Sequence, residues 1–419
     1  MSDFSPAAAI QAAVIYALVF GTVWLEAAAP VVSNVRASQR AGSKVADIYY
    51  DLADPDSATV RVSLQISSDG GTTWVVPAQT LVGTGFGDLV KPGNGRWIKW
   101  DAGVDWNGQV SDKVRFRVIA NDDPIPAGMA LIPAGNFAMG DSTNSADGST
   151  RAYELPVHTV YVSAFYMDRY EVTKQLWDEV RTWATSNGYT DLPTGSGKAA
   201  NHPLQSISWY SMVKWCNARS QKDGLNPVYY TNDTQTTLYK TGSVDVTNAQ
   251  VRWNANGYRL PTEAEWEKAA RGGFSGQIFS WGQTVTHNRA NYYSSSGYSY
   301  DVSPTRGYHP TYAVGGTPYT SPVGSFAPNG YGLFDMEGNV WEWCWDRFSS
   351  TWYNESGATA NDPQGPPDWT SPYSQYRVLR GGSWSLPYGA YGCRSAFRIN
   401  FGNPGITSWN DGGFRCVRR

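Results

Sequence analysis

An acidic stretch around Gly338 contains the residue types that bind a hard cation. Asp335 and Glu337 precede the glycine and Glu342 follows it, so side-chain and main-chain oxygens of one turn could converge on an ion. Calcium in proteins takes about six to eight such oxygen ligands. The spacing alone fits an ordinary tight turn with solvated acids better than a metal site, and both interpretations stay open at this point.

The sequence has four cysteines, Cys216, Cys344, Cys393 and Cys416, without a Cys-x-x-Cys motif or a mixed cysteine-histidine cluster. The four histidines are scattered singly, so a structural zinc site is not predicted. A local signature of cysteine-histidine catalysis is missing as well. If the chain is exported, its even number of cysteines predicts two disulfides, and three different pairings are possible. Free buried thiols are the alternative.

Aromatic residues are frequent in this chain and charged residues are rare. Of 419 residues, 14% are aromatic, including 19 Trp, and only 16% are charged, against about 25% in an average soluble domain. This composition excludes a disordered chain and a coiled coil. The net charge of -3, without a basic stripe, excludes a nucleic-acid groove. A loop-rich globular protein remains, whose rings either pack inside or face a ligand.

Residues 30–122 show the period of two that is typical of strands with one buried face, most clearly over Val60–Ile66. A glycine turn after Asp69 predicts a hairpin. Short strands without a convincing helix over this length predict a small all-β sandwich of immunoglobulin or fibronectin type. Prolines and acidic residues at 123–126 predict a linker, and residues 127–419 form the second predicted domain.

The first 29 residues contain one uncharged apolar run, from Pro6 to Leu25, followed by small residues at 27–29. The run is long enough to span a bilayer, but it lacks the positive segment that usually opens a signal peptide. A secretory signal, an uncleaved membrane anchor and an N-terminal helix docked elsewhere all stay open. Export is the favoured interpretation, which predicts a secreted or cell-surface protein.

Helices are predicted only beyond residue 127. Thr173 can cap a helix, and Thr262 with Glu265 forms a capping box at the start of another. A third helix is predicted over 208–220. The expected apolar side of the first comprises Leu176, Val180, Trp183 and Ala184. After Gly272 the chain consists mainly of turn signals and short strands, so the fold class is α+β.

Five short sequence blocks within residues 127–419, taken together and in their order along the chain, are specific enough to indicate a protein family. They are Met129–Gly140, Tyr258–Glu267, Gly338–Trp343, Arg380–Trp384 and Gly413–Arg415. Together they resemble the formylglycine-generating enzyme family, also called sulfatase-modifying factor. The resemblance implies that family's C-type-lectin-like α+β fold, with little regular structure, and it does not include the N-terminal sandwich.

Active members of this family oxidise a cysteine of a sulfatase to formylglycine with copper(I) and oxygen. They hold the metal with two cysteines, and the positions that match these here are Ala390 and Ser395. Copper(I) is a soft ion that needs thiolate ligands. The resemblance therefore implies a family member without the oxidase site, and copper is not expected.

The resemblance also implies structural calcium. The positions that bind calcium in these members match Asp335, Gly338, Val340 and Glu342 of this sequence. Gly338 and Val340 would bind through their main-chain carbonyls. A second calcium site of the family would begin at Asn291 and Tyr292, although an acidic partner for it is hard to place in this sequence.

A disulfide pairing follows from the same resemblance. In the family, a cysteine on the helix that matches 208–220 is commonly bridged to one in the terminal Gly-Phe-Arg-Cys strand. The matching residues are Cys216 and Cys416. This pairing would leave Cys344 to bond with Cys393.

The segment between Trp384 and Gly413 is rich in Tyr, Ser, Asn and Gly, a composition typical of antibody paratopes. Its framework also looks like the C-terminal variable region of retroelement-diversified lectin-fold proteins, whose residues between framework positions contact the ligand. The predicted ligand-binding residues are Tyr388, Tyr391, Phe397, Asn400, Phe401, Asn403, Ser408, Trp409 and Asn410. Each could instead pack inside a loop, and Arg394 and Arg398 are expected to brace the fold.

These features predict a secreted or surface protein that binds a protein or glycan ligand through an aromatic-rich C-terminal surface. One alternative is an enzyme of the family with altered metal ligands, and another is a structural or assembly component of a surface structure. Four tryptophans in the family blocks are expected in the core: Trp266, Trp341, Trp343 and Trp384.

Overall fold

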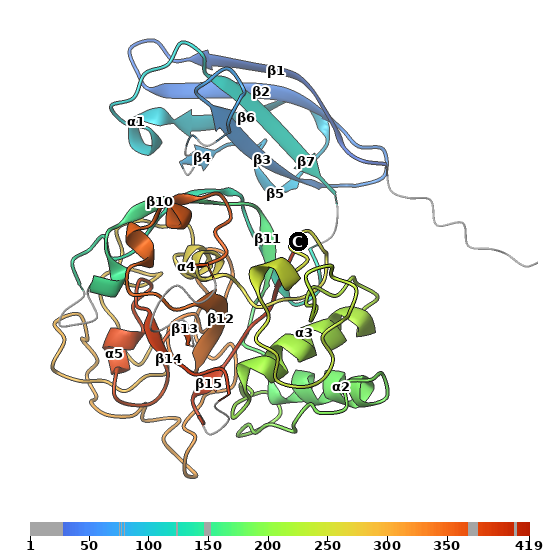
Figure 1. Ribbon diagram of the computed structural model, residues 1–419. Helices are drawn as coiled ribbons and strands as arrows, with labels where there is room; N and C mark the ends of the chain where they lie inside the picture. The colour runs from blue at the N-terminus through green and yellow to red at the C-terminus, as the bar shows by residue number, and fades with distance from the viewer. Residues whose placement is uncertain are drawn as a thin grey trace, which may run out of the picture.

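The computed structural model describes residues 28–74, 76, 78, 80–122, 125–145, 152–367, 376–405 and 409–419, apart from the side chains at positions 88, 401 and 402. The predicted N-terminal signal or anchor therefore lies outside the described residues. Among the residues that are described, no helix is long and apolar enough to cross a membrane. Figure 1 shows an all-β part in blue and cyan above a larger mixed part.

The N-terminal part consists of two antiparallel sheets. One has the order β1-β2-β6-β4 and the other β5-β3-β7. Their bounds are β1 Val31–Gln39, β2 Val45–Ala53, β3 Val60–Ser67, β4 Leu81–Val82, β5 Gly87–Val90, β6 Gly93–Asp101 and β7 Arg115–Asn121. A short helix, α1 (Ala102–Asp105), follows β6. The all-β prediction is confirmed, while the immunoglobulin or fibronectin type stays a prediction, as do the exact domain boundaries.

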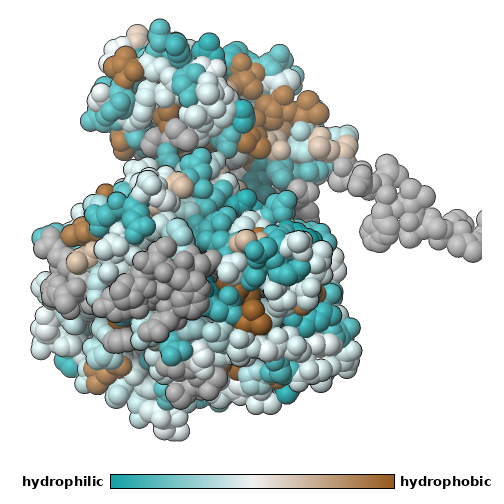
Figure 2. Space-filling view, viewed as in Figure 1, coloured by the Kyte–Doolittle hydropathy of each residue, from teal (hydrophilic) through white to brown (hydrophobic). Residues whose placement is uncertain are grey.

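The alternating pattern explains this sandwich. Every second residue of β3 is buried, including Val62 and Ile66, and these side chains share one core with Ile48 of β2 and Ile98 of β6. The outward residues are polar or solvent-exposed, as expected for sheets with one buried face. On the face shown in Figure 2, the largest brown area lies on this sandwich. Two valines of β1, Val31 and Val35, are exposed.

The larger part is mixed α+β, as predicted, and its strands are short. Two sheets have the orders β16-β11-β8 and β14-β13-β12-β15, and β9 pairs with β10. Their bounds are β8 Met129–Ile132, β9 Gly135–Met139, β10 His158–Val162, β11 Phe165–Asp168, β12 Trp341–Arg347, β13 Arg377–Arg380, β14 Ile399–Gly402, β15 Gly412–Gly413 and β16 Val417–Arg418. Because β16 pairs with β11, the last residues of the chain add an edge strand to the sheet formed by β8 and β11, the first and fourth strands of this part.

The predicted helices are present, with the predicted caps. The main ones are α2 Lys174–Thr185, α3 Trp209–Lys222 and α4 Glu263–Ala270. Shorter helical segments are η2 Asn248–Gln250, between α3 and α4, and η3 Trp352–Asn354, η4 Ser356–Thr359 and α5 Gly389–Gly392 after α4. The Thr173 hydroxyl accepts a hydrogen bond from the Leu176 amide, and Thr262 with Glu265 forms the capping box. The apolar side of α2 differs from the prediction in two respects: Trp177 is fully buried, and Leu176 and Trp183 are only partly buried.

The core around these elements combines rings with buried ion pairs. The four family-block tryptophans are all buried, which confirms their predicted role. Arg394 and Arg398 are also buried, and each braces the fold through a two-pronged contact with a carboxylate. Buried pairs among the described residues include Arg394–Glu154, Arg398–Glu263, Arg380–Glu267, Arg271–Glu267, Arg415–Glu342, Arg219–Asp168 and Arg259–Glu265. Removing either partner of such a pair would destabilise the fold, because it would leave an unpaired charge in the interior.

Lys268 of α4 is buried among main-chain acceptors and gives a pH prediction. Its ammonium donates to the carbonyls of Gly135 and Val162 (Nζ–O 2.8 and 3.1 Å), and burial lowers the pKa of Lys268 to about 7. The unfolded chain keeps this proton up to about pH 10. The contribution of Lys268 to the unfolding free energy should therefore rise between about pH 7 and pH 10, because the unfolded state alone binds the proton there.

The measurement is urea unfolding across this pH range. Lys268→Met is expected to flatten the rise in unfolding free energy, because the group that titrates differently in the two states is gone. Lys222→Met, on the exposed end of α3, should keep the wild-type slope. An unchanged slope in Lys268→Met would contradict the prediction.

Candidate functional site

The acidic turn predicted from the sequence lies just before β12 and is held in an unusual backbone conformation. Asp335, Gly338 and Asn339 all have positive φ values of 54°, 96° and 63°. A Cβ on Gly338 would lie 2.6 Å from the Asn291 carbonyl oxygen, so only glycine fits there. The Asn339 amide also donates to that carbonyl (2.8 Å). The turn is thus folded tightly against the segment at Asn291.

Asp335 offers one free oxygen inside this turn. Its Oδ2 accepts a hydrogen bond from the Gly324 amide (2.6 Å). Its Oδ1 is buried and has no hydrogen-bond partner among the described residues. Burial raises the pKa of Asp335 to about 6. A buried carboxylate oxygen without a partner fits a cation ligand, because a hard cation would replace the hydration that the oxygen has lost.

Glu342 is already engaged. Both of its carboxylate oxygens accept from the Arg415 guanidinium (2.6–2.9 Å), and Oε2 also accepts from the Trp266 indole (2.8 Å). As a predicted metal ligand, Glu342 would have to share its carboxylate with Arg415. The sequence could not reveal this pairing, since 73 residues separate the two.

Glu171 belongs to this cluster and was missed by the sequence analysis. It is 1% exposed, and it accepts from the Val340 amide (3.1 Å) and the Asn339 side chain (2.7 Å). Burial, together with the charges of Asp335 and Glu342, raises its pKa well above the usual value. Three acidic residues therefore surround one arginine in a buried space, which favours a cation there. The only sequence signal was an acid two residues before Thr173, the cap of α2.

The second predicted metal set does not form a separate site among the described residues. Asn291 packs on the Gly338 turn, and its side-chain amide donates to the Tyr319 carbonyl (2.8 Å). Tyr292 is fully buried, and its hydroxyl donates to Asp301 (2.7 Å). Asp301 is the acidic neighbour that the sequence did not identify. It is satisfied by hydroxyl and amide donors and by the nearby Arg306 guanidinium.

The positions that would hold copper are filled without thiols. Ala390 lies in α5 and is fully buried, and the Ser395 hydroxyl donates to Glu337 (3.4 Å). The nearby Cys393 is buried, and desolvation, with the charges of Glu337 and Asp301, raises the pKa of its thiol well above the usual value. These residues do not fit copper(I), because the ion needs thiolates and none is supplied at either position.

The predicted disulfide pairs have different outcomes. The sulfurs of Cys216 and Cys416 lie 3.6 Å apart in the core, although all four cysteines are free thiols in this structure. Cys344 and Cys393 lie in two different core clusters, and no contact joins their sulfurs in the part of the chain that is described. Neither predicted bond is formed in this structure, and only the Cys216–Cys416 pair has a sulfur contact among the described residues, because Cys344 in β12 and Cys393 after α5 lie in separate core clusters.

The predicted ligand-binding residues separate into buried and accessible groups. Phe397 is fully buried and Tyr391 is 5% exposed, so their prediction as displayed rings is wrong. They contact each other (centroids 4.9 Å apart), and Tyr391 also stacks on Tyr298 (5.5 Å). Sequence spacing could not show that Tyr391 in α5 and Phe397 after it both pack into the core.

The accessible group comprises the other described candidates, and Trp409 is the largest ring among them, with packing that links it to Trp343. Tyr388, Asn400 and Trp409 are half-buried, while Asn403 and Asn410 are exposed. Ser408 and the Phe401 side chain lie outside the described residues. The Trp409 ring is backed by Trp343 (centroids 6.2 Å apart, 25° between planes). Its carbonyl accepts from the Ser206 amide (3.0 Å), which ties this loop to the start of α3.

Comparisons with known proteins agree with the motifs. The family model described as "Sulfatase-modifying factor enzyme 1-like domain" matches residues 116–419. The formylglycine-generating enzyme of Streptomyces coelicolor is 33% identical over 314 residues, which cover 69% of this chain and 88% of that protein.

Two further proteins are similar over the same part. The inactive C-alpha-formylglycine-generating enzyme 2 of Bos taurus is 30% identical over 305 residues, which cover 69% of this chain and 87% of that protein. The solved structure of Treponema denticola variable protein 1 is 29% identical and covers 70% of this chain and 94% of that chain, with a TM-score of 0.48.

Proposed function

The chain belongs to the sulfatase-modifying factor enzyme 1-like family, and from this premise we propose that it binds a protein or glycan ligand on the face around Trp409 without making formylglycine. The observation that carries the proposal is the pair of buried, thiol-free residues Ala390 and Ser395 where active members hold copper. The Bos taurus relative, named as inactive, supports a family role without this chemistry.

The face around Trp409 supports the binding half of the proposal. A half-buried indole backed by a second ring supplies rigid contact area at a low entropic cost. Exposed Asn403 and Asn410 lie in the adjoining loop segments and supply amide groups that can adapt to a partner. The Pro404 carbonyl accepts from the Trp209 amide (3.1 Å), so both segments are anchored near the start of α3.

The test is a screen of the full chain on a glycan array and on an array of extracellular protein fragments, followed by titration of each binder. Trp409→Ala should weaken binding by about tenfold or more, as expected for an aromatic anchor. Trp281→Ala is the matched control, since Trp281 is half-buried elsewhere in the same domain and stacks on Phe279. Equal affinity of wild type and Trp409→Ala for every binder would contradict the proposal.

A structural calcium ion at the Asp335 turn is part of the same proposal. The ion would use the unpartnered Asp335 oxygen and main-chain carbonyls such as those of Gly338 and Val340, and it would neutralise the excess of buried acid. Calcium at a hundred times its Kd adds about 2.7 kcal/mol to the unfolding free energy. Thermal unfolding should therefore shift upward with calcium and downward with EDTA.

Asp335→Asn is expected to abolish this calcium-dependent shift, because it replaces the charged ligand. Glu179→Gln, at an exposed position on α2, should keep the shift of the wild-type protein. An identical unfolding temperature in calcium and in EDTA for the wild-type protein would contradict the calcium site.

We further propose that the chain acts outside the cytoplasm, secreted or at the cell surface, where Cys216 and Cys416 form a disulfide. Their sulfurs are already 3.6 Å apart, and the bond would join residues 200 positions apart. A bond of this kind typically adds about 2–4 kcal/mol to stability. After mild oxidation, mass spectrometry of peptides should find this single bond and two alkylatable thiols, Cys344 and Cys393. Four free thiols, or a bond involving Cys344, would contradict it.

A further inference from the structure

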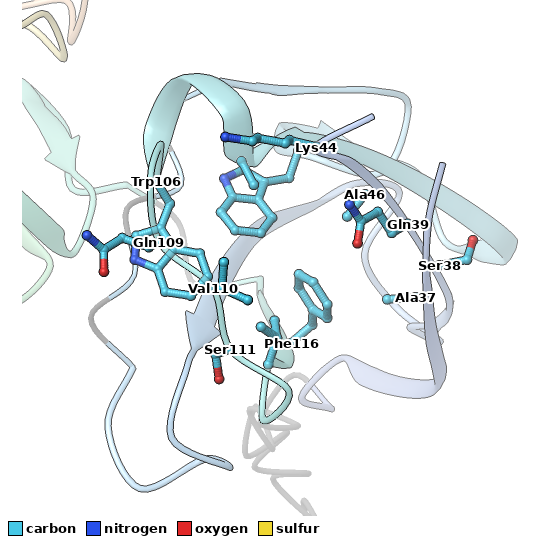
Figure 3. A pocket seen from close by; sticks show the side chains of 13 residues that line it. Ala37, Ser38, Gln39, Lys44, Ala46, Trp106, Gln109, Val110, Ser111 and Phe116 are labelled. Carbon is cyan, nitrogen blue, oxygen red and sulfur yellow. The ribbon is translucent and has the colours of Figure 1, made fainter. Parts of the chain in front are cut away.

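A pocket of about 350 Å³ opens at one end of the N-terminal sandwich, where α1 follows β6 (Figure 3). Its volume lies within the range of about 300–1,000 Å³ that small-molecule sites occupy. The walls come from the end of β1, the start of β2, the end of β6, α1 with its following turn, and β7. Apart from Phe116, the residues that line this pocket precede the part of the chain that the family model matches, and the function proposed for the C-terminal face gives them no role.

The floor of the pocket is aromatic and held in place. Trp100 is 3% exposed, and its indole donates to Asp105 (3.0 Å). Asp105 also accepts from the amide and the hydroxyl of Thr80 (both 2.9 Å), so the carboxylate is fixed in turn. Phe116 meets Trp100 edge to face with centroids 6.0 Å apart. A ligand would therefore meet a preformed apolar surface, which lowers the cost of ordering the site.

The rim differs from the floor, because it is mostly polar. Gln39, Lys44, Gln109 and two serines line the opening beside the half-buried Trp106. Figure 3 shows Trp106 and Phe116 on either side of Val110, which is 95% exposed. Among the described residues that line the pocket, none carries a carboxylate. The site therefore combines ring faces with hydroxyl, amide and ammonium groups and lacks a partner for a cationic ligand.

We propose that this pocket binds one pyranose unit of a neutral oligosaccharide, with the C–H face of the sugar against Trp106 and its hydroxyls toward the polar rim. A pyranose has an apolar face, which would contact the aromatic rings of the pocket, and a polar edge, which would face the polar rim. Several rim groups are already fixed by the protein, since Lys44 donates to Asn107 (2.7 Å) and the Ser111 hydroxyl to the Ser68 carbonyl (2.6 Å). A purely apolar peptide side chain would desolvate the remaining donors and acceptors of these groups, which costs free energy. The inference concerns the N-terminal sandwich and stands apart from the function proposed for the Trp409 face.

The test titrates the full chain with cellohexaose, mannohexaose and chitohexaose, followed by tryptophan fluorescence and calorimetry. At least one should bind, and Trp106→Ala should weaken that binding by about tenfold or more, whereas Trp106→Tyr, which keeps a ring face, should largely retain it. Trp74→Ala is the matched control, because Trp74 is a half-buried tryptophan of the same sandwich that lies outside the pocket and stacks on Arg117 (3.9 Å).

Circular dichroism and thermal unfolding show whether each variant is folded. Trp409→Ala should leave oligosaccharide binding unchanged, so the two proposals fail separately. The pocket proposal is overturned if none of the three sugars binds, if folded Trp106→Ala binds as tightly as wild type, or if Trp409→Ala and not Trp106→Ala abolishes binding.

Discussion

Replacing Glu267 by alanine is expected to lower the free energy of unfolding by about 3–5 kcal/mol, the range for breaking a buried ion pair. Glu267 is fully buried in α4 and accepts from Arg271 (2.6 Å), from Arg380 and from the Gly140 amide (2.8 Å). Burial alone would raise the pKa of Glu267, but the two arginines hold it below its usual value. Without Glu267, two buried guanidinium groups would lack their shared counter-charge.

Urea unfolding at pH 7 measures this effect. Glu179→Ala is the control, because Glu179 is a glutamate on the exposed side of α2, and its loss should change stability by about 0.5 kcal/mol or less. A similarly small change in Glu267→Ala would mean that the arginine network does not stabilise the fold.

Phe414→Ala is expected to have an effect of similar size, about 3–5 kcal/mol. Phe414 is fully buried and stands edge-on to both Trp177 and Trp215, with centroids 6.3 and 5.5 Å away and interplanar angles near 90°. Trp177 and Trp215 come from α2 and α3 and stack on each other at 5.5 Å. The ring of the terminal Gly-Phe-Arg block thus joins the last residues of the chain to both helices.

The measurement is again equilibrium unfolding, with near-ultraviolet circular dichroism to follow the environment of the tryptophans. Phe274→Ala provides the comparison, since its ring is 52% exposed and a surface truncation costs little. A loss confined to about 1 kcal/mol in Phe414→Ala, with an unchanged tryptophan signal, would show that this ring does not hold the two helices together.

The sequence predicted the features that depend on local chemistry. Thr173 and Thr262 were recognisable as helix caps, because a threonine hydroxyl at this position accepts a hydrogen bond from the main-chain amide three residues later. In the capping box, the glutamate three residues after Thr262 accepts from the threonine amide in return. The alternation in β3 predicted a half-buried strand for the same local reason. The tryptophans of the family blocks were correctly placed in the core.

Features that depend on long-range contacts could not be predicted. Phe397 and Tyr391 lie in a segment whose composition is typical of a binding loop. Both are buried instead, partly because rings from residues about 90 positions earlier in the chain, such as Tyr298, pack on this segment. The engagement of Glu342 by Arg415, and the approach of Glu171 to the Asp335 turn, arise only when distant segments meet. Composition gives the number of aromatic and charged residues, but only the packing of the folded chain determines which of them are exposed at the surface.

The central claim is that this family member lacks the oxidase chemistry, and one measurement tests it most directly. The reduced chain is incubated with copper(I), oxygen and a sulfatase peptide that contains the target cysteine, while oxygen consumption and peptide mass are followed. The Streptomyces coelicolor formylglycine-generating enzyme serves as the active reference. The expected result is neither oxygen uptake nor aldehyde above the level without protein. Copper-dependent conversion of the cysteine to formylglycine would contradict the account.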